Sequence, residues 1–402
     1  MTLPDASGSG HVRGLARTLS NSGIMALFPP PETALSAPDV HWLSDDAALA
    51  EACRYWATLP AIGLDTEFVR TRTFHARLGL IQVGAEDRVW FVDAPTVRDY
   101  APFSQILAAQ TPIKIIHSGS EDVEIFNRLG DETLQGFFDT QVAAALCGLG
   151  PSLSYQALVD TLCGIEIEKD VTRSDWTKRP LSDAQIRYAA LDVVHLEALH
   201  SQLSERLASL ERLAWVQEDC DHLVSRTPLN ALLDEQYRRF KYAWKLKAAQ
   251  RSALRQLLGW RENTARERDR PRNHIALDDD LLKISRELPS DKEALLALDL
   301  RHKRSIARWS RGIVATVAAA REAEPPAAPP EPLDRTHKTL IKALRDVIAE
   351  EATRLGIAPE VLCGKRELLT LLQQGRPSPR LDGWRYRRLA PLFEPLLTEN
   401  AL

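Results

Sequence analysis

The chain has 402 residues and a net charge of −4, with 26% charged and 44% apolar residues. This is ordinary globular usage, which excludes a wholly disordered or fibrous chain. No run approaches the ~18 apolar residues of a membrane span, and the polar N-terminus does not fit a secretory signal. The five cysteines are scattered without a Cys-x-x-Cys pattern. This argues against a zinc module and a disulfide framework, and favours a reducing, cytoplasmic location.

Charge is distributed unevenly along the chain. Residues 40–210 carry 14 basic and 24 acidic residues, a net charge of −10. Residues 225–320 carry 21 basic and 12 acidic residues, a net charge of +9, and residues 333–402 carry 12 and 9, a net charge of +3. A basic middle segment indicates a polyanionic partner, but two oppositely charged surfaces that pack together would give the same pattern. Charge alone leaves both interpretations open.

Four segments in the first half have the pattern of short strands. AIGLDTEFV, LGLIQVG, RVWFVDA and IKIIH are rich in β-branched and aromatic residues, with turn residues between them. Glu86 and Asp87 lie where a hairpin turn would join the second segment to the third. A helix is expected over residues 120–129, with Ser118 or Ser120 as its N-cap. Strands and helices in this order predict an α/β domain.

The pattern becomes helical from Ser182 onward. Ser182 and Gln185 match the S-x-x-Q capping box that starts many helices. Residues 228–320 contain several helical stretches and no convincing strand, and residues 334–402 are helical again. Between them, AEPPAAPPEP has the composition of an extended, fairly stiff linker.

These patterns predict a division of the chain into domains. We expect a flexible extension over residues 1–38 and an α/β domain over residues 39–215. Two small all-α domains are expected over residues 226–320 and 334–402, joined by a Pro/Ala linker over residues 321–333. Both helical domains contain a Gly-Trp-Arg tripeptide, which suggests that they are distant copies. No coiled-coil pattern is present, so a monomer is the default expectation.

Two carboxylates project from one of the predicted strands. Asp65 and Glu67 in AIGLDTEFV lie two residues apart and therefore face the same side. Burying unpaired carboxylates is costly, and a divalent cation would compensate their charge. An edge strand that turns its polar face to water would explain the pair as well. The apolar residues on both sides of the pair suit a central strand better.

Two further acidic positions are expected on helices. Asp122 lies in the first turn of the helix after IKIIHSG, where its charge also suits the helix dipole. Tyr188 and Asp192 in IRYAALDVVHL are four residues apart and share one helix face. A hydroxyl and a carboxylate side by side can hold a water molecule, but a packed tyrosine and a solvent-facing aspartate are common on any helix. Each signal is weak by itself.

Taken together, the motifs resemble the ribonuclease D family of 3′→5′ exonucleases. The resemblance rests on LDTEFVRTRTF, LGLIQ, HSGSEDVEIF, FDTQVAA and TRSDWTKRPLSDAQIRYAALDVVHL. It implies a ribonuclease-H-like fold, which is a mixed sheet flanked by helices. The wider DEDD superfamily is named for four carboxylates that bind two metal ions, and the match places them at Asp65, Glu67, Asp122 and Asp192. Tyr188 marks the tyrosine branch, because the histidine branch would have His where this chain has Arg187.

The helical part carries a second resemblance. LLGWRENTARERDRPRNHIALDDDLLKIS resembles the helicase-and-RNase-D C-terminal (HRDC) domain, a nucleic-acid-binding module, and residues 335–402 resemble a more divergent copy. The family has this order of domains. One departure is Phe74-His75-Ala76, where the family usually has an aromatic residue followed by proline.

The resemblance implies a two-metal-ion hydrolysis with Mg²⁺ or Mn²⁺, which releases nucleoside 5′-monophosphates from the free 3′ end of RNA. Asp65 would lie between both ions, with Glu67 and Asp192 on the ion nearer the nucleophile. Asp122 would act on the other ion, and Tyr188 would orient the attacking water. Precursors of transfer RNA are the implied substrates, and no membrane partner is expected.

Two alternatives stay open. A DNA 3′→5′ exonuclease of the same superfamily would use the same carboxylates. A nucleic-acid-binding scaffold with an inactive nuclease domain is less favoured, because no motif carboxylate is missing.

In the basic region, aromatic residues alternate with lysine and arginine, and bases of single strands stack on such aromatics. We expect instead that they form the core of the domain; they are Tyr237, Phe240, Tyr242 and Trp244.

Overall fold

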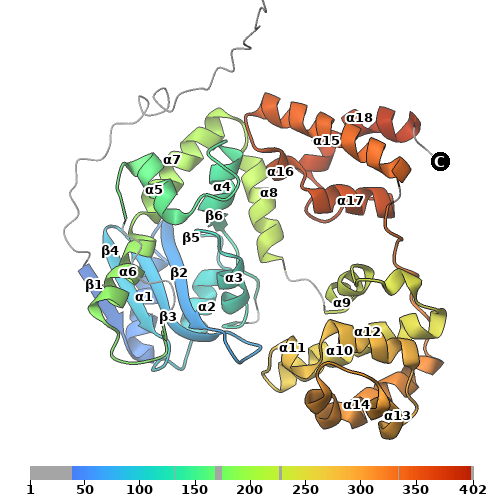
Figure 1. The fold of residues 1–402 in the computed structure, drawn as a ribbon. Coiled ribbons are helices and arrows are strands. Elements are labelled where there is room, and N and C mark those ends of the chain that lie inside the picture. The colour runs from blue at the N-terminus through green and yellow to red at the C-terminus, as the bar shows by residue number, and fades with distance from the viewer. Residues whose placement is uncertain (1–38, 131, 168–173, 226–228, 334, 400–402) are drawn as a thin grey trace, which may run out of the picture.

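The computed structural model describes residues 39–399 except for short gaps at 131, 168–173, 226–228 and 334 (Figure 1). The expected N-terminal extension, residues 1–38, lies outside the described residues. All five cysteines are buried and free. No helix in the described ranges combines the length and the apolar character that crossing a membrane requires.

Six strands among the described residues form one mixed sheet in the first domain (Figure 1). In spatial order they are β1 (Asp39–Leu43), β4 (Arg88–Asp93), β3 (Arg77–Ala85), β2 (Ala61–Val69), β5 (Ile113–Ile116) and β6 (Phe137–Asp139). Strand β3 runs antiparallel to β2 and β4, and the other paired strands are parallel. The predicted α/β fold is confirmed, and β2 spans the AIGLDTEFV segment as predicted.

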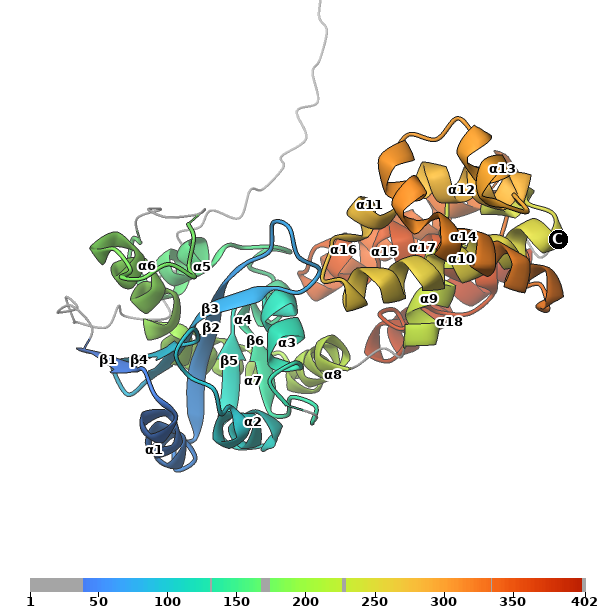
Figure 2. The same ribbon diagram turned by 90° about the horizontal axis from the view of Figure 1, so that it is seen from below.

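Helices cover both faces of this sheet. Figure 2 shows α1 (Asp46–Trp56) and α2 (Ala101–Ala108) on one side and α6 (Asp183–Val194) on the other. Helix α7 (Leu196–Ser209) contacts β2, β3 and β5. The remaining helices of the domain are α3 (Ser120–Phe126), α4 (Thr140–Leu146), α5 (Tyr155–Cys163) and α8 (Leu213–Val224). The apolar core lies between these layers and the sheet.

Local sequence signals were right at one turn and one helix N-cap, and wrong at a second N-cap. Glu86 and Asp87 form the β3–β4 turn with φ of 49° and 63°, the backbone of a type I′ hairpin turn. The capping box of Ser182 with Gln185 is present at the start of α6. The prediction of a serine cap for α3 was wrong, because its N-cap is Gly119 and no side chain caps the helix.

Two groups of helices follow the first domain (Figure 1). We call residues 229–322 the first helical module and residues 335–399 the second helical module. The first contains α9 (Leu229–Arg238), α10 (Ala248–Glu267), α11 (Arg272–Ile275), α12 (Asp278–Glu287), α13 (Lys292–Ala297) and α14 (Lys303–Glu322). The second contains α15 (Arg335–Leu355), α16 (Pro359–Leu362), α17 (Lys365–Gln374) and α18 (Trp384–Glu399).

The two Gly-Trp-Arg tripeptides are not equivalent, so they do not support a duplication. One lies inside α10, at residues 259–261, and the other spans the start of α18, at residues 383–385. Helix lengths give a better argument. The series α10, α11, α12 and α14 has 20, 4, 10 and 20 residues, and α15 to α18 have 21, 4, 10 and 16. Helices α12 and α17 both end at a residue with positive φ, Leu288 and Gly375.

The aromatic residues of the first module divide into two groups. Tyr237 is 3% exposed and Phe240 packs against the core, as expected. The expectation was wrong for Tyr242, which is 44% exposed. The ammonium groups of Lys241 and Lys245 lie 5.0 and 5.9 Å from its ring centre. This ring therefore contributes little to the core.

The second module packs directly on the first domain. Its buried side chains belong to the same apolar cluster as those of the sheet and its helices. Trp384 stacks on Trp215 of α8, with ring centres 4.2 Å apart and planes 3° apart. Arg385 is 4% exposed and forms two bonds with the Asp219 carboxylate. The second module is thus held by a packed interface as well as by the linker.

Candidate active site

Two glycines allow helix α6 to approach the sheet closely. Gly63 and Gly84 are paired across β2 and β3. A Cβ atom on Gly84 would lie 2.7 Å from the carbonyl oxygen of Val193, and one on Gly63 would lie 2.9 Å from the Cβ of Leu196. No larger side chain fits without moving the backbone. Because Asp192 directly precedes Val193, this close approach brings its carboxylate to the sheet.

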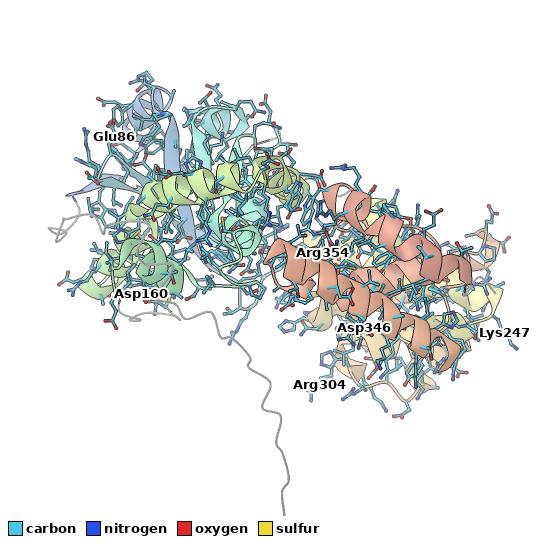
Figure 3. All side chains as sticks on the ribbon, turned by 90° about the horizontal axis from the view of Figure 1, so that it is seen from above. Glu86, Asp160, Lys247, Arg304, Asp346 and Arg354 are labelled. Carbon is cyan, nitrogen blue, oxygen red and sulfur yellow. The ribbon has the colours of Figure 1, made fainter. Side chains whose placement is uncertain are left out.

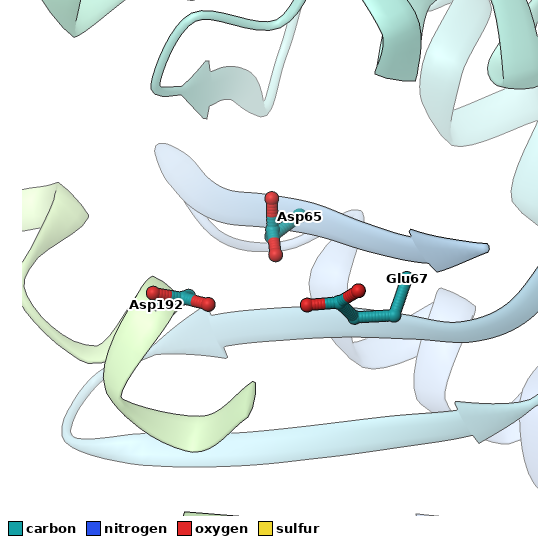
Figure 4. Close-up of side chains that lie close together, drawn as sticks. All are labelled: Asp65, Glu67 and Asp192. Carbon is teal, nitrogen blue, oxygen red and sulfur yellow. The ribbon is translucent and has the colours of Figure 1, made fainter. Parts of the chain in front are cut away.

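Strand β2 and helix α6 place three carboxylates together (Figure 4). Asp65 and Glu67 share one face of β2, as the period of a strand predicts. Asp192 comes from α6, and one oxygen from each of the three lies within 4.8 Å of the others. Residues more than a hundred positions apart in the chain thus form one acidic cluster.

Asp122 lines the pocket that contains these three carboxylates, but it lies outside the group of three. We call this hollow the acidic pocket. Asp122 belongs to the first turn of α3 and is 7% exposed. The Thr66 hydroxyl donates a hydrogen bond to its Oδ1. The pocket has a volume of about 270 Å³, and no lysine or arginine is among the described residues that line it. All four predicted carboxylates and Tyr188 line this pocket.

Burial raises the pKa values of these carboxyl groups, and repulsion among the four acids adds to the effect for Asp65 and Glu67. Burial is the largest cause for each of them. The pKa of Asp65 is raised well above its usual value, with the charges of the other three acids adding to the effect. The pKa values of Glu67, Asp192 and Asp122 are raised to about 8, about 7 and about 6. The protein alone does not compensate four negative charges here.

The donor set fits divalent cations. Carboxylate oxygens are hard ligands, which suit Mg²⁺ or Mn²⁺ better than softer metals. A cation would supply the charge that the lining residues lack, and would lower the pKa values that burial raises. The cluster of Asp65, Glu67 and Asp192 therefore has the chemistry of a metal site.

Tyr188 belongs to the same constellation. It lies one helical turn before Asp192 on α6 and donates a hydrogen bond to its carboxylate. Its ring centre lies 6.1 Å from that of Trp176. Burial and the nearby acidic charges raise the pKa of Tyr188, so its hydroxyl stays protonated at neutral pH. This group can donate a hydrogen bond, and it is a poor base.

The sequence analysis gave no role to several residues that hold the acids in place. Gln82 is fully buried on β3, and its Nε2 donates to Oδ2 of Asp65 at 3.3 Å. Trp176 forms a side-chain hydrogen bond with Glu67. Tyr155 lines the pocket, and its hydroxyl accepts a bond from the backbone N–H of His195 at 3.3 Å. Gln82 and Trp176 both lie in segments that carry the family resemblance, LGLIQ and TRSDWTKRP, and a glutamine in an otherwise apolar segment was a signal in itself.

Asp139 at the end of β6 fixes the start of α3. Its carboxylate accepts hydrogen bonds from the backbone N–H groups of Ser118 and Gly119, at 3.1 and 2.9 Å. It also caps α4. His117 is held nearby by Thr140 and by the Leu153 carbonyl, so it is a satisfied structural histidine. These bonds determine where α3 begins and therefore where Asp122 points.

The fold and two family models define the class of protein. A model described as 3′-5′ exonuclease matches residues 40–208, the part that contains the sheet and the acidic pocket. A model described as HRDC domain matches residues 250–317. The chain therefore combines a 3′-5′ exonuclease domain with a helical module of the HRDC type.

Proteins that are similar over nearly the whole chain identify the family within this class. Ribonuclease D of Pseudomonas paraeruginosa is 41% identical over 364 residues, which are 88% of this chain and 96% of that protein. Ribonuclease D of Escherichia coli is 30% identical over 369 residues, 89% of this chain and 98% of that protein. The chain belongs to the ribonuclease D family, as its sequence motifs indicated.

Solved structures agree with this assignment. The crystal structure of Escherichia coli RNase D, an exoribonuclease involved in structured RNA processing, superposes with a TM-score of 0.81 at 29% identity. It covers 90% of this chain and 99% of that one. The catalytic core of RRP6 from Trypanosoma brucei has a TM-score of 0.52 at 20% identity and covers 74% and 84%, which shows a shared fold.

Proposed function

We propose that the protein is a 3′→5′ exoribonuclease that releases nucleoside 5′-monophosphates from RNA. The observation that carries the proposal is the pocket in which one buried and three half-buried carboxylates meet without a lysine or arginine among its described lining residues. Membership of the ribonuclease D family supports RNA as the substrate. All four motif carboxylates are present, which argues against an inactive scaffold.

The carboxylates would hold two divalent cations. Asp65, Glu67 and Asp192 offer oxygens close enough to share a cation, and Asp122 would act on a second one from α3. When bound, Mg²⁺ or Mn²⁺ would stabilise negative charge on the phosphate and lower the pKa of a water molecule. Gln82 orients Asp65, and Trp176 orients Glu67. The protein's own part in catalysis is thus to hold ligands, substrate and water in one geometry.

Tyr188 would position the attacking water by a hydrogen bond. We expect Tyr188→Phe to lower kcat about 10- to 100-fold, because a misplaced nucleophile reacts slowly, while RNA affinity changes little. Steady-state kinetics and fluorescence anisotropy with the same RNA would measure the two quantities. Tyr100→Phe, a tyrosine outside the pocket, should leave kcat unchanged. Equal kcat in Tyr188→Phe and wild type would remove Tyr188 from the mechanism.

The raised pKa values predict an unusual dependence of stability on pH. Exposed carboxyl groups titrate near pH 4, and these titrate between about 6 and about 8 in the folded protein without cations. The folded state then binds more protons than the unfolded chain, so the free energy of unfolding falls as pH rises from about 4 to about 8. Added Mg²⁺ or Mn²⁺ should restore stability, most strongly at the upper end.

Thermal unfolding in EDTA across this pH range would test that expectation. The comparison is with Asp192→Asn, which removes one of the titrating groups and should lose less stability as pH rises. A cation-induced rise in Tm that is as large at pH ~5 as at pH ~8 would contradict the assignment, because protons and cations compete for the same oxygens.

Digestion of matched 5′-labelled RNA and DNA oligonucleotides tests the proposed reaction. With Mg²⁺ or Mn²⁺ we expect RNA to shorten stepwise from its 3′ end, and with EDTA we expect no cleavage. A ladder on DNA alone would overturn RNA as the substrate and retain the metal site. Binding of RNA without any cleavage would favour the scaffold. Precursors of transfer RNA, a monomeric state and a cytoplasmic location remain predictions for the natural setting.

A further inference from the structure

The first helical module carries a strongly basic pocket. It has a volume of about 730 Å³ and lies between α11, α14 and the ends of the neighbouring loops. We call it the arginine pocket; its lining residues are Arg268, Arg270, His274, Ile275, His302, Arg304, Ser305, Arg308 and Trp309. No aspartate or glutamate is among these described lining residues. Figure 3 shows the labelled Arg304 side chain projecting outward from the module.

The charges in this pocket are uncompensated, unlike others in the module. Arg261 pairs with Asp278 at 2.6 Å, and Arg301 pairs with Asp279 at 2.7 Å. Within the described part of the chain, no ion pair involves the pocket arginines, which are Arg268, Arg270, Arg304 and Arg308. Four guanidinium groups around one hollow repel one another, and a polyanion would remove that cost. The pocket therefore fits a chain of phosphates.

A second hollow connects the arginine pocket to the first domain. It has a volume of about 280 Å³ and is lined from both sides, by residues of the loop after β2 and by residues 271–274. His274 lines both hollows. At the other end, Arg70 pairs with Glu124 at 2.9 Å and approaches Glu121 at 3.9 Å. Glu121 lines the acidic pocket, so the three hollows follow one another.

A specific contact holds this path together. The loop between β2 and β3 reaches toward α11 (Figures 1 and 2). The Asp269 carboxylate accepts hydrogen bonds from the N–H groups of Phe74 and His75, at 3.0 and 2.9 Å. The guanidinium carbons of Arg266 and Arg272 lie 5.0 and 4.7 Å from the Phe74 ring centre. The first domain and the arginine pocket thus keep one relative orientation.

The fully buried carboxylate of Glu262 orders both arginines of this contact. It accepts hydrogen bonds from Arg266 at 2.9 Å and from Arg272. Arg266 and Arg272 are therefore occupied in joining the domains. The pocket arginines form no such ion pair within the described residues, although the guanidinium groups of Arg268 and Arg308 lie 5.8 and 6.0 Å from the Trp309 ring centre. The arginines that join the domains are thus distinct from the pocket arginines.

We propose that the arginine pocket binds the sugar–phosphate backbone of the RNA strand upstream of the 3′-terminal nucleotide that the acidic pocket holds. This inference rests on the proposed function for the position of the 3′ end. The strand would pass along the seam between the β2–β3 loop and residues 271–274. The acidic pocket repels phosphates until cations bind, so the attraction for a long substrate comes from this module.

RNA affinity in a hydrolysis-deficient background tests the proposal directly. The protein is the full chain with Asp65→Asn, and the test variant adds Arg304→Gln and Arg308→Gln. The matched control adds Arg286→Gln and Lys292→Gln, two exposed basic residues of the same module outside the pocket. A fluorescent single-stranded RNA of about 20 nucleotides, longer than typical single-strand binding sites, is the probe.

Loss of two phosphate contacts has a calculable effect. The slope of log affinity against log salt should decrease by about 1.4, and affinity at ~0.1 M monovalent salt should fall roughly 25-fold. The control should match the parent in both quantities. Unchanged affinity in the test variant, or an equal loss in the control, would overturn the proposal. All four substituted residues are exposed, so thermal unfolding should be unaffected.

Kinetics with Asp65 intact separate this inference from the proposed function. We expect the ratio of kcat/KM on the long RNA to that on a dinucleotide to fall at least ~10-fold in the Arg304→Gln, Arg308→Gln variant. An unchanged ratio would overturn the role of the arginine pocket while leaving the exonuclease intact. If wild type cleaves no RNA at all, the proposed function fails, and the affinity comparison still decides whether the pocket binds RNA.

Discussion

Replacing Asp65 with asparagine is expected to abolish RNA hydrolysis while leaving RNA binding and folding intact. Asp65 is a half-buried member of the acidic cluster, within reach of Glu67 and Asp192. Asparagine has the same shape as aspartate but no charge, so the substitution would weaken cation binding. A metal ion supplies several kcal/mol of charge stabilisation, and the loss of ~4 kcal/mol corresponds to about 10³-fold in rate. Digestion of 5′-labelled RNA would measure the effect.

The same substitution should stabilise the protein when cations are absent. Burial and the neighbouring acids raise the pKa of Asp65, which means that its ionised form is disfavoured in the folded state. Removing that charge should therefore raise Tm in EDTA at pH ~8. Loss of activity with a higher Tm cannot come from unfolding. Asp160→Asn, an exposed acid on α5, serves as the control with normal activity. Wild-type cleavage by pure Asp65→Asn would refute the metal assignment.

Of the substitutions that we predict, Asp219→Ala is expected to lower the free energy of unfolding most. Its carboxylate accepts bonds from the Arg385 guanidinium and from the Trp384 indole N–H, the latter at 3.1 Å. The side chains of Arg385 and Asp219 are only 5% and 12% exposed. Removing one partner of a buried ion pair leaves an unpaired charge, at a cost of roughly 3–5 kcal/mol.

Denaturant unfolding and limited proteolysis would detect this loss. Asp221→Ala, an exposed residue on the same helix, should change the free energy of unfolding by less than about 0.5 kcal/mol. We expect Asp219→Ala to expose the second helical module to protease at lower denaturant concentrations than wild type. Identical unfolding of Asp219→Ala and wild type would show that the interface between the module and the first domain contributes little.

This interface changes what a truncation can show. A linker between two separately folded helical domains, as the sequence predicts, would let residues 323–402 be removed without harm to the exonuclease domain. The structure shows that Trp384 covers Trp215 and that the second module shares the apolar cluster of the first domain. Such a truncation would uncover this surface and destabilise the exonuclease domain. Point variants at Asp219 are therefore the better experiment.

Patterns among neighbouring residues were enough to predict most of the strands and helices and the candidate site residues. The period of two in AIGLDTEFV placed Asp65 and Glu67 on one face of a strand, and the spacing of four placed Tyr188 and Asp192 on one helix. The turn at residues 86–87 follows from its position between two strand patterns. These features depend on neighbours in the chain, so they can be derived from the sequence without knowing the fold.

Tertiary packing decided the rest. The close contact of Gly84 with Val193 brings Asp192 to β2, and Gln82 becomes a partner of Asp65 only when β2 and β3 pair. The raised pKa values, the docking of Arg385 on Asp219 and the arginine pocket likewise arise where distant segments meet. Burial and electrostatic interactions depend on distances in space, which the order of residues alone does not specify.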